Sequence, residues 1–209
     1  MESAASLFVI AAPSGAGKTT LVKALVERNP ALKFSISFTT RKQRITEENG
    51  RDYFFVTTDE FEALRQNGEL LESALVFDNS YGTSRSQVEE HLANGDHVIL
   101  EIDWQGARQV RQSMPGCVTI FILPPSRPEL ERRLRGRRTD SDEVIARRLR
   151  DALGDMSHWD EFDYVIVNDD LNRAIAELEA VLEGRGESAS TNNAELRRRV
   201  EAIVAPASK

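Results

Sequence analysis

The chain has 209 residues, of which 40% are hydrophobic, and a net charge of −7 at pH 7. This length suits one α/β domain with insertions or two small domains, and the net charge argues against general affinity for nucleic acid or membranes. No apolar run approaches the length of a membrane-spanning helix, and we expect no secretory signal in the first residues. The one cysteine, Cys117, suits a cytoplasmic protein without disulfides, and the three histidines lack the spacing of zinc ligands.

The first predicted elements form a strand, a loop and a helix. Leu7–Ala12 is apolar and typical of a buried parallel strand. The next residues are small, and the segment from Lys18 onward has helical spacing. Together they match the phosphate-binding pattern G-x-x-x-x-G-K-[ST], except that Ala12 stands at the first glycine position.

This pattern predicts a site for phosphate groups. Gly15 and Gly17 allow backbone angles that turn successive N–H groups into one concavity, and the helix N-terminus adds further donors. Lys18 would bind the β- and γ-phosphates, and the Thr19 hydroxyl would bind Mg²⁺. The alternative is a plain strand, turn and helix with a surface lysine, which the Gly-Ala-Gly-Lys-Thr-Thr run disfavours.

The next stretch interrupts the alternation of strands and helices with short strands and turns, and we interpret residues 34–84 as an inserted subdomain. Its predicted elements are the strands Phe34–Phe38, Tyr53–Val56 and Glu69–Phe77, a helix with Phe61 and Leu64 on one face, and a turn at Asn79–Gly82.

Alternating buried strands and helices then resume. The predicted helices are Ser84–Asn94, Gln105–Met114, Pro128–Arg138, Val144–Met156 and Leu171–Leu182, and the strands are His97–Ile102, Cys117–Leu123 and Asp163–Val167. A linker is expected at Gly184–Ser190, followed by a charged helix over Asn192–Val204 with Asn192 as its cap. The alternation predicts a parallel sheet covered on both faces, with ligands at the carboxyl ends of its strands. That edge would carry the Ala12–Thr19 loop, Glu101 and Asp103, and Asn168.

A second set of motifs lies outside the phosphate-binding loop. The run TTRKQRITEENGRDYFFV supplies Arg41, Arg44, Glu47 and Tyr53, and further matches are Glu72, Tyr81-Gly82-Thr83, Asp103-Trp104-Gln105-Gly106, Arg133, Arg137, Arg148 and Asn168-Asp169-Asp170. On these residues the chain resembles the guanylate kinase family over about Leu7 to Leu182. Two positions depart from the family pattern: Ala12, and Glu101 where an aspartate is usual.

The resemblance implies an α/β P-loop NTPase fold of three layers around a parallel sheet. It divides the chain into a core, a GMP-binding subdomain, a lid and a C-terminal helical extension: 1–33, 85–126 and 157–186; 34–84; 127–156; and 187–209. It also implies Mg²⁺-dependent transfer of the γ-phosphoryl group from ATP to GMP in the cytoplasm, with no nucleic-acid or membrane partner. A homo-oligomer, with the C-terminal helix as a surface or subunit contact, stays open.

The resemblance implies a role for each matched residue. ATP would be bound by Ala12, Pro13, Ser14, Gly15, Ala16, Gly17, Lys18, Thr19, Arg133, Arg137 and Asn168. GMP would be bound by Ser37, Arg41, Arg44, Tyr53, Glu72, Tyr81, Thr83 and Asp103. The catalytic residues would be Lys18, Arg41, Arg44, Arg137 and Arg148, and Thr19 and Asp103 would hold Mg²⁺, the latter through water.

The chemistry of GMP suits these side chains. Two guanidinium groups and two phenols suit a phosphate dianion. A carboxylate at Glu72 can accept both guanine N–H donors, and a hydroxyl of Ser37 or Thr83 can donate to O6. Judged alone, Arg41 and Arg44 could instead form a solvated basic patch, Glu72 could face solvent, and the tyrosines could be packing residues.

Eight arginines crowd Arg132–Arg150. Arg133, Arg137 and Arg148 match the family and are assigned to phosphates; the others, Arg132, Arg135, Arg138, Arg147 and Arg150, are expected to be solvated or ion-paired. Rival interpretations are a sugar-phosphate kinase resembling ribose bisphosphate phosphokinase, a phosphopeptide-binding module and, from the arginines, a nucleic-acid binder. Glu72 argues against the first, and the intact Gly17-Lys18-Thr19 run argues against the second.

Overall fold

The computed structural model describes residues 5–76, 78–136 and 141–205. The chain divides into two compact units: unit 1 is Met1–Val9 with Pro30–Val118, and unit 2 is Ile10–Asn29 with Thr119–Lys209. The predicted α/β alternation is confirmed, because the larger sheet has five strands in the order β2-β7-β1-β8-β9, with β2 parallel to β7 and β8 parallel to β9. Strand β1 (Leu7–Ala11) is divided between the two units and is buried along its whole length.

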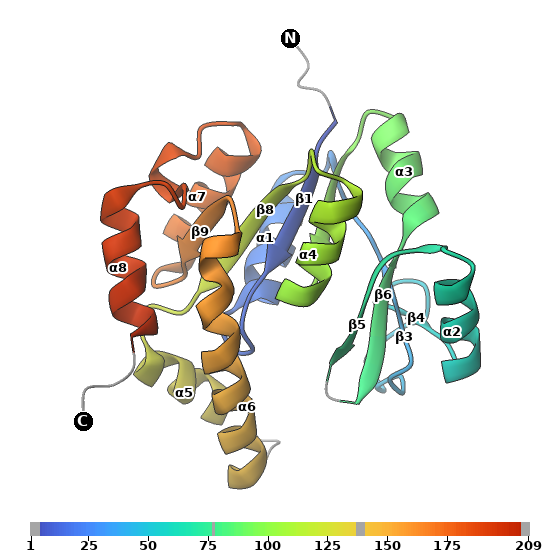
Figure 1. Cartoon of the computed structure of the whole chain (residues 1–209), viewed down its shortest axis with the longest axis horizontal. Coiled ribbons are helices and arrows are strands. Elements are labelled where there is room, and N and C mark those ends of the chain that lie inside the picture. The colour runs from blue at the N-terminus through green and yellow to red at the C-terminus, as the bar shows by residue number, and fades with distance from the viewer. Residues whose placement is uncertain (1–4, 77, 137–140, 206–209) are drawn as a thin grey trace. The chain divides into compact units, whose positions relative to one another are not determined.

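Unit 1 contains the elements between residues 30 and 118, which include a second, smaller sheet (Figure 1). Its strands are β2 (Leu32–Phe34), β3 (Ser37–Thr39), β4 (Phe54–Phe55), β5 (Leu70–Val76), β6 (Asn79–Ser84) and β7 (His97–Glu101). Its helices are α2 (Thr58–Gln66), α3 (Arg85–Ala93) and α4 (Trp104–Ser113). The smaller sheet has the order β4-β3-β6-β5, with β6 antiparallel to both of its neighbours.

Unit 2 places helices around β8 and β9. Its strands are β8 (Val118–Leu123), whose first residue belongs to unit 1, and β9 (Tyr164–Val167). Its helices are α1 (Lys18–Arg28), α5 (Arg127–Arg135), α6 (Asp142–Asp155), α7 (Leu171–Leu182) and α8 (Ala194–Val204), with 3-10 turns η1 (Met156–Glu161) and η2 (Glu187–Ala189).

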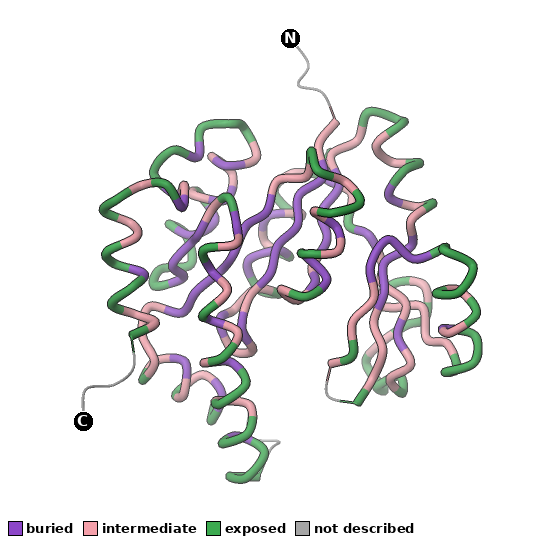
Figure 2. The backbone as a smooth tube through the Cα atoms, in the orientation of Figure 1, coloured by how far each residue is buried: buried purple, intermediate pink, exposed green. Residues whose placement is uncertain are grey.

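Burial is most complete along the central strands of the larger sheet, whereas the smaller sheet is partly half-buried and the outer helix faces are exposed (Figure 2). The apolar side chains of β1 and β8 supply much of the core, as expected for parallel strands buried on both faces. Several buried side chains are polar: Ser35, Thr39, Glu72, Thr83, Ser84, Thr119, Asn168 and Thr191. Burying a polar group costs free energy unless the group is hydrogen-bonded, so such side chains are candidates for a structural or binding role.

Two predicted elements of unit 1 were wrong. The alternating Phe34–Phe38 run is not one strand: β2 pairs with β7 in the larger sheet, whereas β3 pairs with β6 in the smaller one. Alternation reports a half-buried strand but not the sheet to which it belongs. The Asn79–Gly82 turn is instead the start of β6, and the hairpin turns at Asp78, which has φ of 66°.

The C-terminal prediction needs a smaller correction. The cap of α8 is Asn193, whose Oδ1 accepts from the N–H groups of Glu195 and Leu196, rather than Asn192. The expected linker contains η2, with Ala189 buried.

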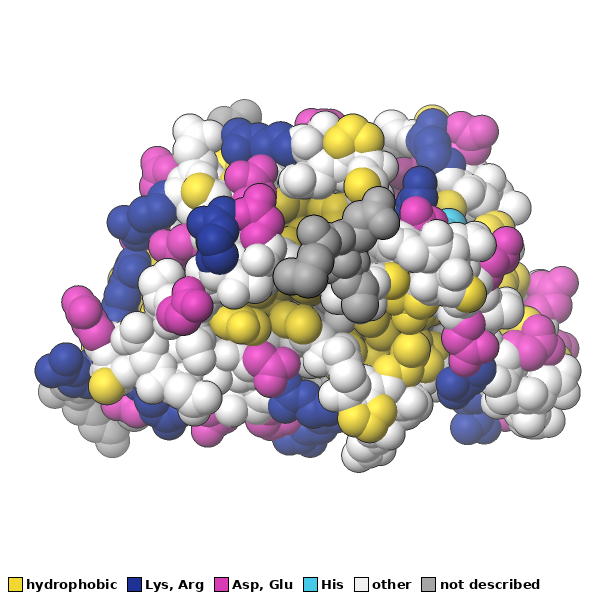
Figure 3. All heavy atoms as spheres, turned by 90° about the horizontal axis from the view of Figure 1, so that it is seen from above, with side chains coloured by type: hydrophobic (Ala, Val, Ile, Leu, Met, Phe, Trp, Pro, Cys, Tyr) yellow, Lys and Arg dark blue, Asp and Glu magenta, His cyan; other side chains and the backbone are white. Residues whose placement is uncertain are grey.

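Arg132, Arg135 and Arg147 on α5 and α6 form ion pairs, as expected for a charged helix face. Arg132 contacts Glu129 at 2.7 Å, Arg135 contacts Glu131 at 2.8 Å, and Arg147 contacts Asp151 at 3.9 Å. On the face seen in Figure 3, basic and acidic side chains are likewise interspersed. Arg137 and Arg138 lie outside the described residues. In the parts of the chain that the structure describes, no helix is long and apolar enough to cross a membrane.

Candidate functional site

The loop between β1 and α1, in unit 2, is shaped by its backbone. Gly15 and Gly17 have φ of 91° and 95°, in the region that favours glycine. Gly17 is the N-cap of α1 and, because it has no side chain, it makes no side-chain hydrogen bond to the start of the helix. Such a terminus suits an anion, as the motif predicted.

Space as well as φ requires glycine here. A Cβ on Gly17 would lie 2.4 Å from Nδ2 of Asn168, and one on Gly15 would lie 3.0 Å from side-chain carbons of both Leu130 and Leu134. Ala12 is different: among the described residues, Asp78 is the one non-glycine residue with positive φ. Ala12 therefore has a backbone conformation that alanine adopts without strain, which explains how the chain dispenses with the first glycine of the motif.

Two side chains hold this loop through a single carbonyl. The oxygen of Ala16 accepts from Nδ2 of Asn168 at 2.8 Å and from Nη1 of Arg133 at 3.1 Å. Arg133 also donates to the Asn168 carbonyl at 2.9 Å and to Glu129 at 2.8 Å. Hydrogen bonds from Arg132 and then Arg133 lower the pKa of Glu129 to about 2, so the carboxylate that orients Arg133 stays ionised at neutral pH.

The other predicted donor-side residues differ in how far they are buried. Pro13 and Ala16 are buried, Ala12, Ser14 and Lys18 are half-buried, and Thr19 is exposed at the start of α1. Arg148 lies half-buried on α6.

Unit 1 aligns three polar side chains across its smaller sheet. Ser37 on β3 is opposite Thr83 on β6, which is opposite Glu72 on β5. Directly opposed residues project from the same face, so the three form a row. Thr83 donates from Oγ1 to Glu72 at 2.7 Å, and both side chains are buried. Glu72 therefore does not face bulk solvent.

Helix α4 closes around the end of this row. A Cβ on Gly106 would lie 2.6 Å from Oε2 of Glu72, so this close approach requires glycine. Gln109 exchanges hydrogen bonds with both backbone groups of Ser73, at 3.0 Å and 2.8 Å, and so pairs the open edge of β5. Asp103 accepts from the N–H of Gly106 at 2.7 Å and caps α4.

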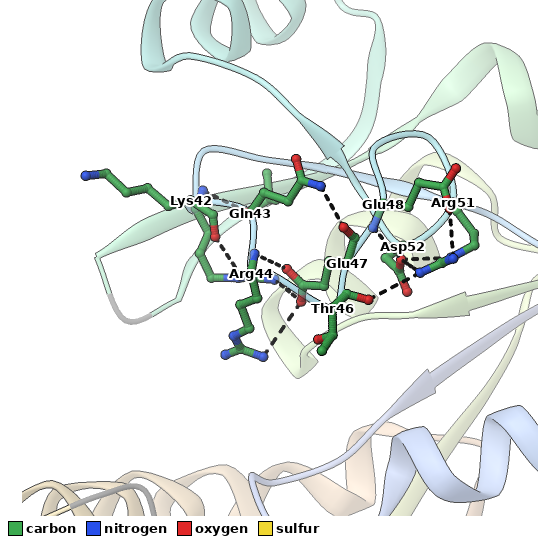
Figure 4. A network of polar contacts seen from close by, with 10 residues as sticks. Lys42, Gln43, Arg44, Thr46, Glu47, Glu48, Arg51 and Asp52 are labelled. Atoms are coloured by element: carbon green, nitrogen blue, oxygen red, sulfur yellow. Dashed lines mark hydrogen bonds and ion pairs between the residues drawn. The ribbon is translucent and has the colours of Figure 1, made fainter.

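The loop after β3 carries the arginines, held by one carboxylate (Figure 4). Glu47 accepts from Nη2 of Arg41 at 2.8 Å and from the N–H of Arg44 at 2.9 Å. The side chains of Arg41 and Glu47 are 16% and 12% exposed, whereas that of Arg44 is 70% exposed. Hydrogen bonding from Arg41 lowers the pKa of Glu47, and the carboxylate in turn raises the pKa of Arg41.

Aromatic rings flank Arg41. Its guanidinium carbon is 5.4 Å from the ring centroid of Tyr53 and 5.7 Å from that of Phe55. Tyr53 meets Tyr81 edge-on with centroids 6.0 Å apart. Burial, followed by the nearby charge of Glu101, raises the pKa of Tyr53, so its phenol remains a hydrogen-bond donor at neutral pH. Tyr81 is two residues before Thr83 on β6, so it projects from the face that carries Glu72.

Structure and sequence differ in what they reveal about this region. Glu47 was matched as a family position, but its role in holding two arginines was not predicted; its spacing of three and six residues from them was the available signal. The closeness of Gly106 to Glu72 left no signal, because the two are distant in sequence. In the described part of the chain, no group of three or more His, Cys, Asp or Glu side chains could hold a metal ion.

A P-loop followed by a monophosphate-type anion site defines a class, the P-loop nucleoside monophosphate kinases. The guanylate kinase family model matches residues 4–185. Guanylate kinases of Alkalilimnicola ehrlichii and Methylococcus capsulatus are 57% and 58% identical over 84% and 85% of this chain and 87% of each relative. The crystal structure of guanylate kinase from Anaplasma phagocytophilum is similar with a TM-score of 0.74 and 34% identity, covering 97% of this chain and 96% of that one.

The chain belongs to the guanylate kinase family. The P-loop NTPase fold implied by the resemblance is confirmed, and the chain is an enzyme of the nucleoside monophosphate kinase class.

Proposed function

We propose that the chain transfers the γ-phosphoryl group of ATP to GMP, with unit 1 binding the acceptor and the loop of unit 2 binding the donor. The row formed by Ser37, Thr83 and Glu72 carries this proposal. It presents hydroxyl and carboxylate groups side by side, next to a loop with two arginines. A purine monophosphate has one polar edge and one dianionic end, which such a pair of regions suits.

Guanine is recognised by the carboxylate end of the row. It offers two adjacent N–H donors, which Glu72 accepts, and O6, to which a hydroxyl of Ser37 or Thr83 donates. Adenine would turn an acceptor toward the buried carboxylate. An unpaired buried charge costs about 1–3 kcal/mol or more, so adenine is rejected.

The GMP phosphate is held by Arg41, Arg44, Tyr53 and Tyr81. Glu47 prepares Arg41 for this by fixing one side of its guanidinium. Because the phosphate is already mostly ionised near neutral pH, with a second pKa of about 6, no general base is required. Catalysis then consists of positioning and charge stabilisation.

The donor phosphates are held by the N–H groups of the loop and by Lys18. Asn168 and Arg133 support the loop from behind through Ala16. We assign Arg137 and Arg148 to the charge that develops on the transferred phosphoryl group.

Mg²⁺ fits the oxygen donors present. The Thr19 hydroxyl follows Lys18 directly, and Asp103 offers a carboxylate with one oxygen engaged in capping α4. Hydroxyl, carboxylate and water ligands are those that Mg²⁺ prefers. Thr19 would hold the ion directly and Asp103 through water; when bound, Mg²⁺ neutralises charge on the ATP phosphates.

The domain roles follow from these assignments. The core would be 1–33, 85–126 and 157–186, the GMP-binding subdomain 34–84, the lid 127–156 and the C-terminal extension 187–209. We further propose that the enzyme works in the cytoplasm, where its substrates ATP and GMP are available, and without nucleic acid. A homo-oligomer is a proposal that sedimentation of the full chain tests.

A coupled assay of ADP release tests the proposal, with GMP, AMP, CMP and UMP as acceptors. We expect turnover with GMP and little with the others. Lys18→Ala should abolish turnover while GMP binding, measured by calorimetry, is retained. Lys23→Ala is the matched control, since Lys23 is exposed on α1 and pairs with Glu27 of the same helix at 4.0 Å. Activity on a sugar phosphate but not on GMP would support the rival kinase, and near-normal turnover of Lys18→Ala would refute the donor site.

A further inference from the structure

The C-terminal extension is held against the rest of unit 2 by specific contacts. Ser190 forms a β-bridge with Tyr164, the first residue of β9. Thr191 donates from its N–H to the Asp163 carbonyl at 3.0 Å and from Oγ1 to the Phe162 carbonyl at 2.8 Å. The whole extension, 187–209, lies beyond residue 185, where the match to the family model ends. The P-loop pattern and the family match therefore do not account for it.

Packing fixes α8 on the same surface. Val200 is fully buried, and the guanidinium carbon of Arg197 lies 5.0 Å from the ring centroid of Trp159 in η1. A helix with one buried face and a stacked cation has a defined position. The side chains that α8 presents to its neighbours are therefore held in place.

One of those side chains reaches the loop after β9. Arg199 donates to Asp169 at 2.6 Å across 30 residues of sequence. Asp169 directly follows Asn168, which donates to the Ala16 carbonyl of the phosphate-binding loop. Burial alone would raise the pKa of Asp169, but hydrogen bonds from the Asp170 N–H, Arg199 and Arg173 lower it, so the partner of Arg199 is ionised at neutral pH.

The other end of α8 reaches the second support of that carbonyl. Arg127, at the start of α5, donates to the carbonyl of Val204. Helix α5 carries Arg133, which donates to Ala16 and Asn168. Asn168 and Arg133, which both donate to the Ala16 carbonyl, therefore lie on segments that contact α8. The first segment does so through Asp169 and the second through Arg127.

We propose that Arg199 is a positioning residue for ATP binding: through Asp169 it holds the Asn168 segment against the phosphate-binding loop. This rests on the proposed function, since it assigns the loop to ATP. Arg199 itself would contact no substrate. The alternative is that α8 merely covers apolar surface, in which case Arg199 contributes to folding stability but not selectively to ATP affinity.

Arg199→Met tests this, because methionine keeps an apolar stem and removes the charge. Arg199 borders a cavity of about 870 Å³ between α5, α6 and α8, so the substitution causes no crowding. We expect KM for ATP and its dissociation constant to rise about two- to fivefold, the range for a partly exposed ion pair. KM for GMP and kcat should be unchanged, and Arg199→Lys should restore part of the ATP affinity.

Arg198→Met is the matched control. It removes an exposed arginine from the same helix, where Arg198 donates from Nε to the Ala194 carbonyl of its own helix at 3.3 Å. Both KM values should match the parent enzyme. In a double-mutant cycle, Arg199→Met should have little further effect on ATP affinity in an Asp169→Asn background, because the two changes break one contact.

Three outcomes would overturn the inference: an unchanged KM for ATP in Arg199→Met, equal increases of both KM values, or a lower melting temperature without a change in ATP affinity. If the parent enzyme does not phosphorylate GMP, the proposed function fails instead. The parent assay therefore separates the two failures. Calorimetric titration with an ATP analogue then gives the donor affinity without turnover.

Discussion

The proposed acceptor and donor regions would bind anions by different means. In unit 1 the candidate ligands are side chains on a loop and a small sheet, and Arg41 is already paired with Glu47 at 2.8 Å. In unit 2 the site is a stretch of backbone, whose shape depends on Gly15 and Gly17 at positive φ. In the first region, a bound phosphate could replace Glu47 as the charged partner of Arg41, whereas in the second region binding depends on the shape of the backbone.

This difference predicts how each region fails. A backbone site tolerates no Cβ where packing is tight, because the loop must move and all of its donors move with it. A side-chain site loses one contact at a time, so single changes there should act on affinity or selectivity rather than on the whole site.

The largest effect is expected for Gly17→Ala. The new Cβ would combine an unfavourable φ of 95° with a 2.4 Å approach to Nδ2 of Asn168. We expect kcat/KM for ATP to fall by about a hundredfold or more, because small displacements of a catalytic loop have effects of that size. Steady-state kinetics measures it, with circular dichroism to verify folding.

Gly154→Ala is the control for that change. Gly154 is exposed in α6, and a Cβ there would meet nothing within 4 Å. We expect unchanged kinetics and a gain of about 0.5–1 kcal/mol in the free energy of unfolding, since alanine favours a helix over glycine. Comparable losses of activity in both variants would contradict a special requirement at Gly17.

Glu72→Gln should act on selectivity. The amide keeps the shape and can still accept from Thr83, but it presents a donor to a guanine donor. We expect kcat/KM for GMP to fall about 30- to 100-fold with no loss of folding stability. Parallel assays with GMP and AMP measure it, and Glu69→Gln, at an exposed position just before β5, serves as control. If Glu72→Gln retained the full preference for GMP over AMP, Glu72 would not be the residue that recognises guanine.

The features that the sequence predicted correctly are those formed by residues close together in the chain. The Lys18 motif and the parallel strands could be predicted because both are local patterns. The predictions of one strand over Phe34–Phe38 and of a turn at Asn79–Gly82 were wrong, because strand pairing with residues far along the chain decides both. The contact of Gly106 with Glu72 likewise joins segments that no spacing rule connects.

Glu47→Gln should have a smaller effect, confined to the acceptor. It removes the charge opposite Arg41, whose guanidinium then gains freedom that GMP must restrict again. We expect KM for GMP to rise about three- to tenfold with KM for ATP unchanged. Glu48→Gln is the control, because Glu48 pairs with Arg51 at 2.8 Å on exposed surface. An equal rise for both substrates would contradict the separation of the two regions.

The smallest effect is expected in the pH profile. Arg41 lowers the pKa of Glu47, so the carboxylate is ionised above the ordinary glutamate range and its contribution is lost only as pH falls below that range. Between pH 5 and 7 the titrating group is therefore the GMP phosphate, with a second pKa of about 6. At saturating ATP, kcat/KM for GMP should therefore be about half its plateau value at a pH of about 6. Glu47→Gln should keep the same midpoint; a shifted midpoint would mean that Glu47 titrates there and that its pairing with Arg41 is weaker than the geometry requires.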